Sequence, residues 1–153
     1  MKRAAFLDRD GVLNRSILVQ GTPRPPKSVN DVVILDGVSE AINQLKKHNF
    51  LPVVITNQPD VARGVIGLDI LTEINLFLGT SLGIENFYVC IHDDIDQCLC
   101  RKPATGLIER AAIELNLDVT NSFLVGDRWK DIEAGQKIGC TSFFIDYSYP
   151  ERQ

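Results

Sequence analysis

The stretch AAFLDRDGVLN, residues 4–14, places two carboxylates directly after a short apolar run. The run Ala4–Leu7 has the length and the continuous hydrophobicity of a strand that is buried on both faces. Asp8 and Asp10 follow it, and Gly11 allows the chain to turn at this point. Two carboxylates in this position can supply one nucleophile and one general acid or base. The stretch therefore predicts an active site at the end of a buried strand.

Short apolar runs and amphipathic segments alternate along the rest of the chain. The runs are predicted strands, at residues 4–7, 51–56, 87–92, 123–125 and 142–145. Apolar residues repeat at i, i+3, i+4 and i+7 in two predicted helices, at residues 38–45 and 108–115. Leu71, Ile74 and Leu78 mark a third helix, and residues 131–138 are a short fourth one. This alternation implies a three-layer α/β fold, in which helices cover both faces of a five-stranded parallel sheet. With 153 residues and no linker, the chain is expected to form one domain, residues 1–153, without a cap domain.

Polar side chains follow four of the predicted strands and should meet at one edge of the sheet, because ligands of parallel α/β sheets lie beyond the carboxyl ends of the strands. The residues at these ends are Asp8 and Asp10; Thr56, Asn57 and Gln58; Cys90, His92 and Lys102; and Asp127, Arg128 and Asp131. Converging carboxylates would repel one another unless a hard cation lay among them, and Mg²⁺ prefers such oxygen ligands. The long segment 15–30, which contains three prolines, is expected to cover this edge.

Residues 90–100 contain three cysteines and one histidine, spaced Cys90-x-His92-x5-Cys98-x-Cys100. Three thiolates and one imidazole are the ligand set of a closed, tetrahedral structural zinc site. Because protein would fill all four positions, we expect the Zn²⁺ to have no catalytic role. It would instead fix the loop that delivers the basic pair at residues 101–102.

The composition argues against several classes of protein. A net charge of −4 and a pI near 5.1 do not suit a general nucleic-acid-binding protein, which needs a basic face. No run approaches the roughly 18 apolar residues of a membrane span, and the run after Met1-Lys2-Arg3 is too short for a signal peptide. We therefore expect a cytoplasmic monomer whose partner is a small phosphate-bearing molecule, neither nucleic acid nor membrane.

Four stretches resemble the motifs of the haloacid dehalogenase (HAD) superfamily of phosphatases: FLDRDGVLN, VVITNQPDVARG, CIHDDIDQCLCRKP and VGDRWKDIEAG. Within that superfamily the chain is similar to subfamily IIIA, the group of histidinol phosphatases and heptose-bisphosphate phosphatases. The resemblance covers nearly the whole chain and implies a HAD-like, Rossmann-like fold with a zinc-stabilised loop. It also implies a magnesium-dependent phosphomonoesterase that works through an aspartyl-phosphate.

The resemblance assigns roles to the carboxylates. Asp8 would be the nucleophile, and Asp10 would protonate the leaving oxygen and then activate water. The Mg²⁺ would be held by Asp8, by the backbone carbonyl of Asp10 and by Asp127. Asp131 would anchor this site without binding the ion directly.

The resemblance also assigns contacts to phosphate and substrate. Thr56 and Lys102 would stabilise charge on the phosphoryl oxygens. The predicted substrate contacts lie on loops at the same edge: Asn57, Gln58, Arg63, Arg101 and Arg128. Because a guanidinium can grip phosphate bidentately, Arg101 and Arg128 are the predicted contacts to the substrate or to its second phosphate.

More than one function fits these motifs. The resemblance favours D-glycero-D-manno-heptose 1,7-bisphosphate 7-phosphatase activity, with histidinol phosphate or another small metabolite phosphate as the alternative substrate. Pro59-Asp60 stands where the heptose enzymes usually have Ser-Gly, and the zinc loop is shorter than is usual. Both features bear on the substrate. The non-enzyme alternatives are a zinc-stabilised binding module and a receiver-like domain, although receivers carry their phosphorylated Asp after the third strand, where this chain has Cys90 and His92.

Overall fold

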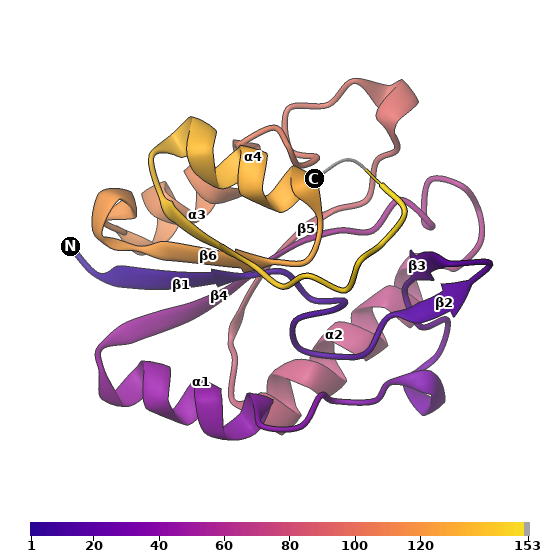
Figure 1. The fold of residues 1–153 in the computed structure, drawn as a ribbon, viewed down its shortest axis with the longest axis horizontal. Helices are drawn as coiled ribbons and strands as arrows, with labels where there is room; N and C mark the ends of the chain where they lie inside the picture. The colour runs from indigo at the N-terminus through magenta and orange to yellow at the C-terminus, as the bar shows by residue number, and fades with distance from the viewer. Residues whose placement is uncertain (152–153) are drawn as a thin grey trace.

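The computed structural model describes residues 1–151 and has a five-stranded parallel sheet at its centre (Figure 1). The strands lie in the order β5-β4-β1-β6-β7. Their bounds are β1 Arg3–Leu7, β4 Phe50–Asn57, β5 Asn86–Cys90, β6 Phe123–Gly126 and β7 Thr141–Phe144. The α-helices are α1 Val38–Lys47, α2 Leu68–Leu82, α3 Gly106–Leu115 and α4 Trp129–Ile138. Figure 1 shows α1 and α2 on one face of the sheet and α3 and α4 on the other, which confirms the predicted three-layer fold.

Strand β1 lies at the middle of the sheet, between β4 and β6. Phe6 pairs with Val53 of β4 on one side and with Leu124 of β6 on the other. Residues 4–6 are completely buried, and the strand is apolar from Ala4 to Leu7 because both of its faces are covered there. The carboxylates that follow β1 therefore leave the sheet at the centre of its carboxyl edge.

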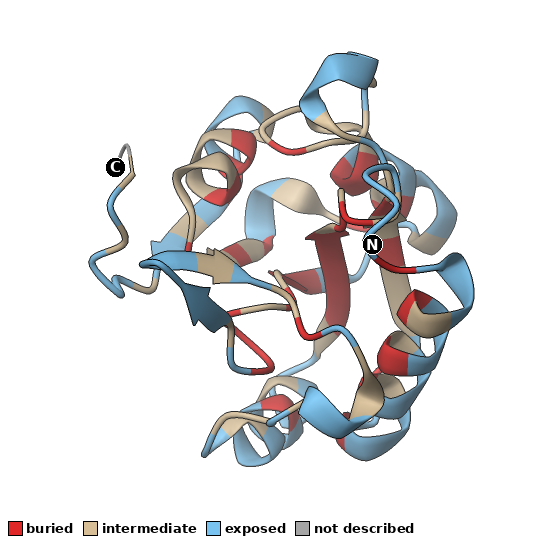
Figure 2. Cartoon of the chain, turned by 90° about the vertical axis from the view of Figure 1, so that its right-hand side faces the viewer, coloured by how far each residue is buried: buried red, intermediate tan, exposed pale blue. Residues whose placement is uncertain are grey.

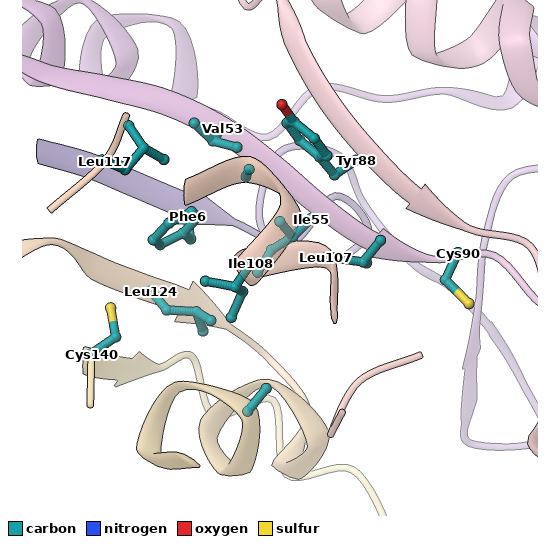
Figure 3. Packing of buried hydrophobic residues seen from close by; sticks show 13 residues of the cluster. Phe6, Val53, Ile55, Tyr88, Cys90, Leu107, Ile108, Leu117, Leu124 and Cys140 are labelled. Carbon is teal, nitrogen blue, oxygen red and sulfur yellow. The ribbon is translucent and has the colours of Figure 1, made fainter. Parts of the chain in front are cut away.

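Two apolar cores hold the layers together. On one face, Phe6 and Leu124 of the sheet pack with Ile108 of α3 (Figure 3). On the other face, Ile42 of α1 and Ile74 of α2 are buried against the sheet. The apolar spacing that predicts these helices thus marks the faces that they bury.

The segment 15–30 forms a small antiparallel hairpin, which the sequence did not predict. Strand β2, Ile17–Val19, pairs with β3, Thr22–Arg24. Between them Gln20 and Gly21 have φ values of 52° and 78°, the left-handed conformation that tight hairpin turns require. All three residues of β2 are exposed, and Figure 2 views the molecule from the side on which the hairpin lies. The expectation that this segment covers the carboxyl edge is confirmed, since residues of β3 line the cleft there.

Other element bounds also differ from the predicted ones. The strand predicted at 87–92 ends at Cys90, so that His92 lies in a loop, followed by a 3₁₀ turn, Asp94–Asp96. The residues after β7, Asp146–Glu151, are called the C-terminal segment. This segment crosses the carboxyl edge of the sheet and is yellow in Figure 1. Within residues 1–151, no helix is both long enough and apolar enough to cross a membrane.

Candidate active site

The carboxyl ends of β1, β4 and β6 border a cleft of about 260 Å³. Nine residues singled out from the sequence line it: Asp8, Asp10, Asn57, Arg63, Arg101, Lys102, Asp127, Arg128 and Asp131. Thr56 and Gln58 are completely buried and do not belong to the lining. The structure thus brings most of the predicted site together at one edge, from four separate parts of the chain.

Lys102 lies at the base of the cleft with only 2% of its surface exposed. Its Nζ donates to Asp8 Oδ1 at 3.1 Å, to Asp131 Oδ1 at 2.5 Å and to the carbonyl of Ile55 at 2.7 Å. Burial disfavours the charged amine, but attraction to Asp131 and Asp8 outweighs burial and raises the pKa of Lys102 above its ordinary value. Lys102 is therefore a fixed cation between two carboxylates.

Asn57 holds the backbone of Lys102. Its Oδ1 accepts from the Lys102 N–H and its Nδ2 donates to the Lys102 carbonyl, both at 3.0 Å. This two-point contact joins the end of β4 to the loop after β5. Asn57 also lines the cleft, so its predicted contact with substrate and this positioning role involve the same residue.

The carboxylates of the cluster carry more negative charge than Lys102 balances. Burial, followed by repulsion from Asp131, raises the pKa of Asp8 well above its ordinary value, although Lys102 acts in the opposite direction. Burial and Asp131 likewise raise the pKa of Asp127 to about 6. Both shifts show that burial and mutual repulsion outweigh the positive charge available to these carboxylates.

These carboxylates fit a divalent cation. Oxygen atoms of Asp8, Asp127 and Asp131 all lie within 4.8 Å of one another. Asp131 already uses both oxygens, one on Lys102 and one on the backbone N–H of Arg128 at 3.1 Å. By contrast, Asp127 Oδ1 is buried and has no hydrogen-bond partner among the described residues. A hard cation with oxygen ligands would satisfy that oxygen and relieve the repulsion.

Two glycines allow the acidic side chains to approach so closely. A Cβ on Gly11, which has φ 86°, would lie 2.1 Å from Asp127 Oδ2. A Cβ on Gly126 would lie 2.2 Å from the Cβ of Asp131. No side chain can occupy either position unless a carboxylate of the cluster moves.

Asp10 is held by three side chains. Arg9 donates from Nε and Nη2 to Asp10 Oδ1 at 3.1 and 3.0 Å, and Asn14 donates to the same oxygen at 2.9 Å. Gln58 donates to Oδ2 at 2.8 Å. Arg9 is completely buried and also donates to Asn75 of α2 at 2.9 Å. The orientation of the Asp10 carboxylate is thereby fixed from below the cleft.

Thr56 contributes to this network rather than to the surface of the cleft. Its Oγ1 accepts from Gln58 Nε2 at 2.9 Å, and the same amide nitrogen donates to Asp10. The structure places Gln58 between Thr56 and Asp10. The predicted contacts of Thr56 and Gln58 with phosphate and substrate remain predictions.

Arg63 lies on one wall of the cleft and is paired with acidic residues. Its Nε and Nη2 donate to the two carboxylate oxygens of Asp93 at 2.7 and 2.9 Å. Its Nη1 lies 3.8 Å from Asp60, which is 5% exposed and also lines the cleft. The carboxylate that distinguishes this chain at Pro59-Asp60 therefore faces the site, and this wall carries no excess of positive charge.

The other wall carries three cations. Arg101 donates from Nε to Asp94 at 2.6 Å, whereas its buried Nη1 has no partner in the part of the chain that is described. Lys130 lies 3.5 Å from the same Asp94 oxygen. Arg128 is held by Glu151 of the C-terminal segment, with nitrogen–oxygen distances of 2.5–2.7 Å. This wall can receive an anionic group, although one that binds Arg128 must compete with Glu151.

The cysteine–histidine cluster has the geometry of a four-ligand metal site. Cys90 Sγ lies 3.7 Å from Cys98 Sγ and 3.1 Å from Cys100 Sγ, and His92 Nδ1 lies 3.5 and 3.2 Å from the sulfurs of Cys90 and Cys100. Ligands roughly 2.3 Å from a tetrahedral zinc would be separated by about 3.8 Å. The backbone N–H of Arg101 also donates to Cys98 Sγ at 3.4 Å. This hydrogen bond holds the loop directly before Lys102 against the cluster.

The sequence and the structure both match known phosphatases. A family model described as HAD-hydrolase-like matches residues 99–147. The D-glycero-beta-D-manno-heptose-1,7-bisphosphate 7-phosphatase of Pasteurella multocida is 35% identical over 147 residues, which cover 89% of this chain and 77% of that protein. The D-glycero-alpha-D-manno-heptose-1,7-bisphosphate 7-phosphatase of Campylobacter jejuni is 31% identical, covering 87% of this chain and 76% of the relative. The chain belongs to the HAD superfamily of phosphatases.

A solved structure supports the same assignment. The D,D-heptose 1,7-bisphosphate phosphatase of B. bronchiseptica, complexed with magnesium and phosphate, superimposes with a TM-score of 0.81 at 28% identity. The match covers 93% of this HAD phosphatase and 79% of the relative. The chain is thus a phosphoric monoester hydrolase by family, as the motifs predict.

Several residues of the HAD phosphatase site were not singled out from the sequence. Arg9 lies between the two aspartates and is completely buried, and no sequence pattern indicates its pairing with Asp10. Asn14, Lys130 and Arg24 also contact or line the site. Tyr149 donates to Asp127 Oδ2 at 2.9 Å. No sequence signal pointed to Tyr149, because it follows the last strand outside every recognised motif.

Proposed function

We propose that this HAD phosphatase hydrolyses a small sugar phosphate, D-glycero-D-manno-heptose 1,7-bisphosphate, at its 7-phosphate. The observation that carries the reaction is the salt bridge between Lys102 and Asp8 at the base of the cleft, inside a cluster of carboxylates. The names of the relatives support the substrate. Those relatives include enzymes named for the alpha and for the beta anomer, so the proposal does not specify the anomer.

In the proposed reaction a carboxylate oxygen of Asp8 attacks phosphorus in line with the ester oxygen. The bond from phosphorus to the ester oxygen breaks, and Asp10 gives its proton to the leaving alkoxide. Asp10 then takes a proton from a water molecule, which attacks the aspartyl-phosphate and releases phosphate and free Asp8. Lys102 stabilises negative charge on the phosphoryl oxygens, and Thr56 assists through the network beneath the site.

We propose that Asp8, Asp127 and the backbone carbonyl of Asp10 hold a Mg²⁺ ion, with Asp131 anchoring the site from behind. The unpartnered Asp127 oxygen and the raised pKa values of Asp8 and Asp127 support this assignment. When bound, the ion neutralises charge on the carboxylates and on the phosphoryl group. The relative from B. bronchiseptica was solved with magnesium and phosphate, which is further support.

We also propose a structural Zn²⁺ ion at Cys90, His92, Cys98 and Cys100. The Cys90–Cys98 sulfur distance and the two sulfur–nitrogen distances, 3.2–3.7 Å, are close to those of a tetrahedral site, whereas the sulfurs of Cys90 and Cys100 lie closer together, at 3.1 Å. The ion would fix the loop that carries Lys102. Free thiols favour a reducing, cytoplasmic location, and we propose that the protein acts there as a monomer.

The proposed substrate suits the two walls of the cleft. The wall with Arg101 and Arg128 would bind the distal phosphate bidentately. The wall with Arg63 and Asp60 is close to neutral and would accept hydrogen bonds from sugar hydroxyls. Asn57 and Gln58 complete the proposed contacts at the end of β4.

The test is phosphate release by zinc-loaded protein in Mg²⁺, from heptose 1,7-bisphosphate, histidinol phosphate and a 3′-phosphorylated oligonucleotide. We expect the heptose to give the highest kcat/KM. Asp8→Asn should abolish turnover, whereas Asp36→Asn, which neutralises an exposed carboxylate outside the cleft, should not change it. Faster release from histidinol phosphate would overturn the substrate, and full activity of Asp8→Asn would overturn the mechanism.

A further inference from the structure

We infer that the C-terminal segment completes the metal site, and that Tyr149 is a positioning residue which orients Asp127 for the divalent cation. The inference rests on the magnesium site of the proposed function. Nothing in the four motifs assigns a role to this segment, which lies beyond the last strand.

Tyr149 fixes one oxygen of Asp127 and leaves the other for a ligand. The phenol donates to Asp127 Oδ2 at 2.9 Å. The second oxygen, Oδ1, is buried without a partner among residues 1–151. Because Gly11 has no Cβ, it leaves room for Oδ2; a Cβ at this position would lie only 2.1 Å from that oxygen. The hydrogen bond from Tyr149 therefore restricts the orientation of the Asp127 carboxylate, with Oδ1 left for a ligand.

The segment is anchored on both sides of Tyr149. Two residues earlier, the Tyr147 hydroxyl donates to the carbonyl of Gly11 at 2.8 Å. Two residues later, Glu151 pairs with Arg128, whose guanidinium lies 6.0 Å from the ring of Tyr149. The rings of Tyr147 and Tyr149 are stacked, with centroids 5.5 Å apart. Figure 1 shows the segment crossing the carboxyl side of the sheet after β7.

Such an arrangement acts on metal affinity rather than on folding alone. Groups that hydrogen-bond to a metal ligand restrict its orientation, and removing one typically weakens metal binding by about 10- to 100-fold. Tyr147 provides a matched comparison, because its hydroxyl anchors the same segment but bonds to a backbone carbonyl instead of a carboxylate. A role confined to anchoring the segment would affect both tyrosines alike.

The experiment measures Mn²⁺ binding without substrate, by the electron paramagnetic resonance signal of the free ion, on zinc-loaded protein. We expect Tyr149→Phe to raise the Kd about tenfold, the lower end of that range. Tyr147→Phe should stay within about twofold of wild type, and Asp127→Asn should lose the site. Circular dichroism of each variant establishes that it is folded.

Each outcome bears on the inference. Binding by Tyr149→Phe that equals or exceeds wild-type binding would overturn it, as would an equal loss in Tyr147→Phe. If wild type binds no Mn²⁺, or if Asp127→Asn binds like wild type, the magnesium site of the proposed function fails as well. A weakened Tyr149→Phe beside an unaffected Tyr147→Phe supports the inference, whichever substrate the enzyme prefers.

Discussion

Replacing Asp127 by Asn should stabilise the magnesium-free protein while abolishing its response to Mg²⁺. Burial and the neighbouring Asp131 raise the pKa of Asp127 from 3.8 to about 6. At pH 7 the folded protein therefore holds an unfavourable buried charge that the unfolded chain does not. Asn has nearly the same shape and removes that charge.

The size of the effect follows from the pKa shift. A shift of about two units corresponds to about 3 kcal/mol, since one unit is about 1.4 kcal/mol. Asn also replaces a charge-assisted bond from Tyr149 with a neutral one, a loss of about 1 kcal/mol. We therefore expect Asp127→Asn to raise the free energy of unfolding by about 1–3 kcal/mol at pH 7 without Mg²⁺.

The contribution of Asp127 to stability changes with pH in a direction set by its raised pKa. Because the folded-state pKa of Asp127 exceeds the unfolded value, the folded protein binds more protons between about pH 4 and pH 6. The contribution of Asp127 to stability is therefore greatest below pH 4 and is lost as the pH rises through about 6. The gap between the variant and wild type should shrink at pH 5.

Chemical denaturation of zinc-loaded protein at pH 5 and pH 7, with and without Mg²⁺, measures these differences. Added Mg²⁺ should stabilise the wild-type protein, more strongly the further the Mg²⁺ concentration exceeds the Kd for Mg²⁺. It should have little effect on Asp127→Asn. A variant that is less stable than wild type at pH 7 without Mg²⁺ would refute the reasoning. So would a stability gap that is the same at both pH values.

Three further changes test other parts of the site. Lys102→Met leaves two buried carboxylates without their cation, so we expect the free energy of unfolding to fall by about 3–5 kcal/mol. Phosphate release should be at least about 1,000-fold slower, and near-normal turnover would contradict the proposed role of Lys102 at the phosphoryl oxygens. Gly126→Ala brings a Cβ within 2.2 Å of Asp131 and should lose about 1–3 kcal/mol together with activity. Gly139→Ala meets nothing within 4 Å but has a φ of 77°, so it should lose stability by backbone strain and keep its activity in the same assay. Cys98→Ser should remove zinc, measured by metal analysis, and lower both Tm and kcat, because the loop before Lys102 is no longer fixed; unchanged zinc content would count against the ligand set.

The layers of the fold were predictable because they depend on periodic burial. Strand β1 is apolar from Ala4 to Leu7 since helices cover both faces, and α1 shows the apolar spacing of its buried side. The hairpin of β2 and β3 was not predictable in this way. Its strands are three residues long, and the apolar run of β2, Ile17–Val19, is too short to indicate a strand and is exposed. Only Gly21 hinted at a turn.

The residues of the site were likewise predictable only in part. Residues that follow a strand directly, such as Asp8 and Asp127, were predicted because parallel strands carry their ends to one edge. The partners that orient them come from elsewhere. Arg9 reaches Asn75 across 66 positions, and Tyr149 reaches Asp127 across 22. Side-chain contacts of this kind depend on how the elements pack, which the sequence pattern does not specify.

The charge of the carboxylate cluster links stability to function. Asp8, Asp127 and Asp131 face a single buried cation, Lys102, and packing around β1 and β6 keeps them together despite their repulsion. A site that was neutral without metal would be more stable but would attract a divalent ion less strongly. The same excess of negative charge that destabilises the metal-free protein therefore favours Mg²⁺ over a monovalent ion. Because this repulsion is relieved only when a cation binds, Asp127→Asn should gain stability in the metal-free protein and lose magnesium affinity at the same time.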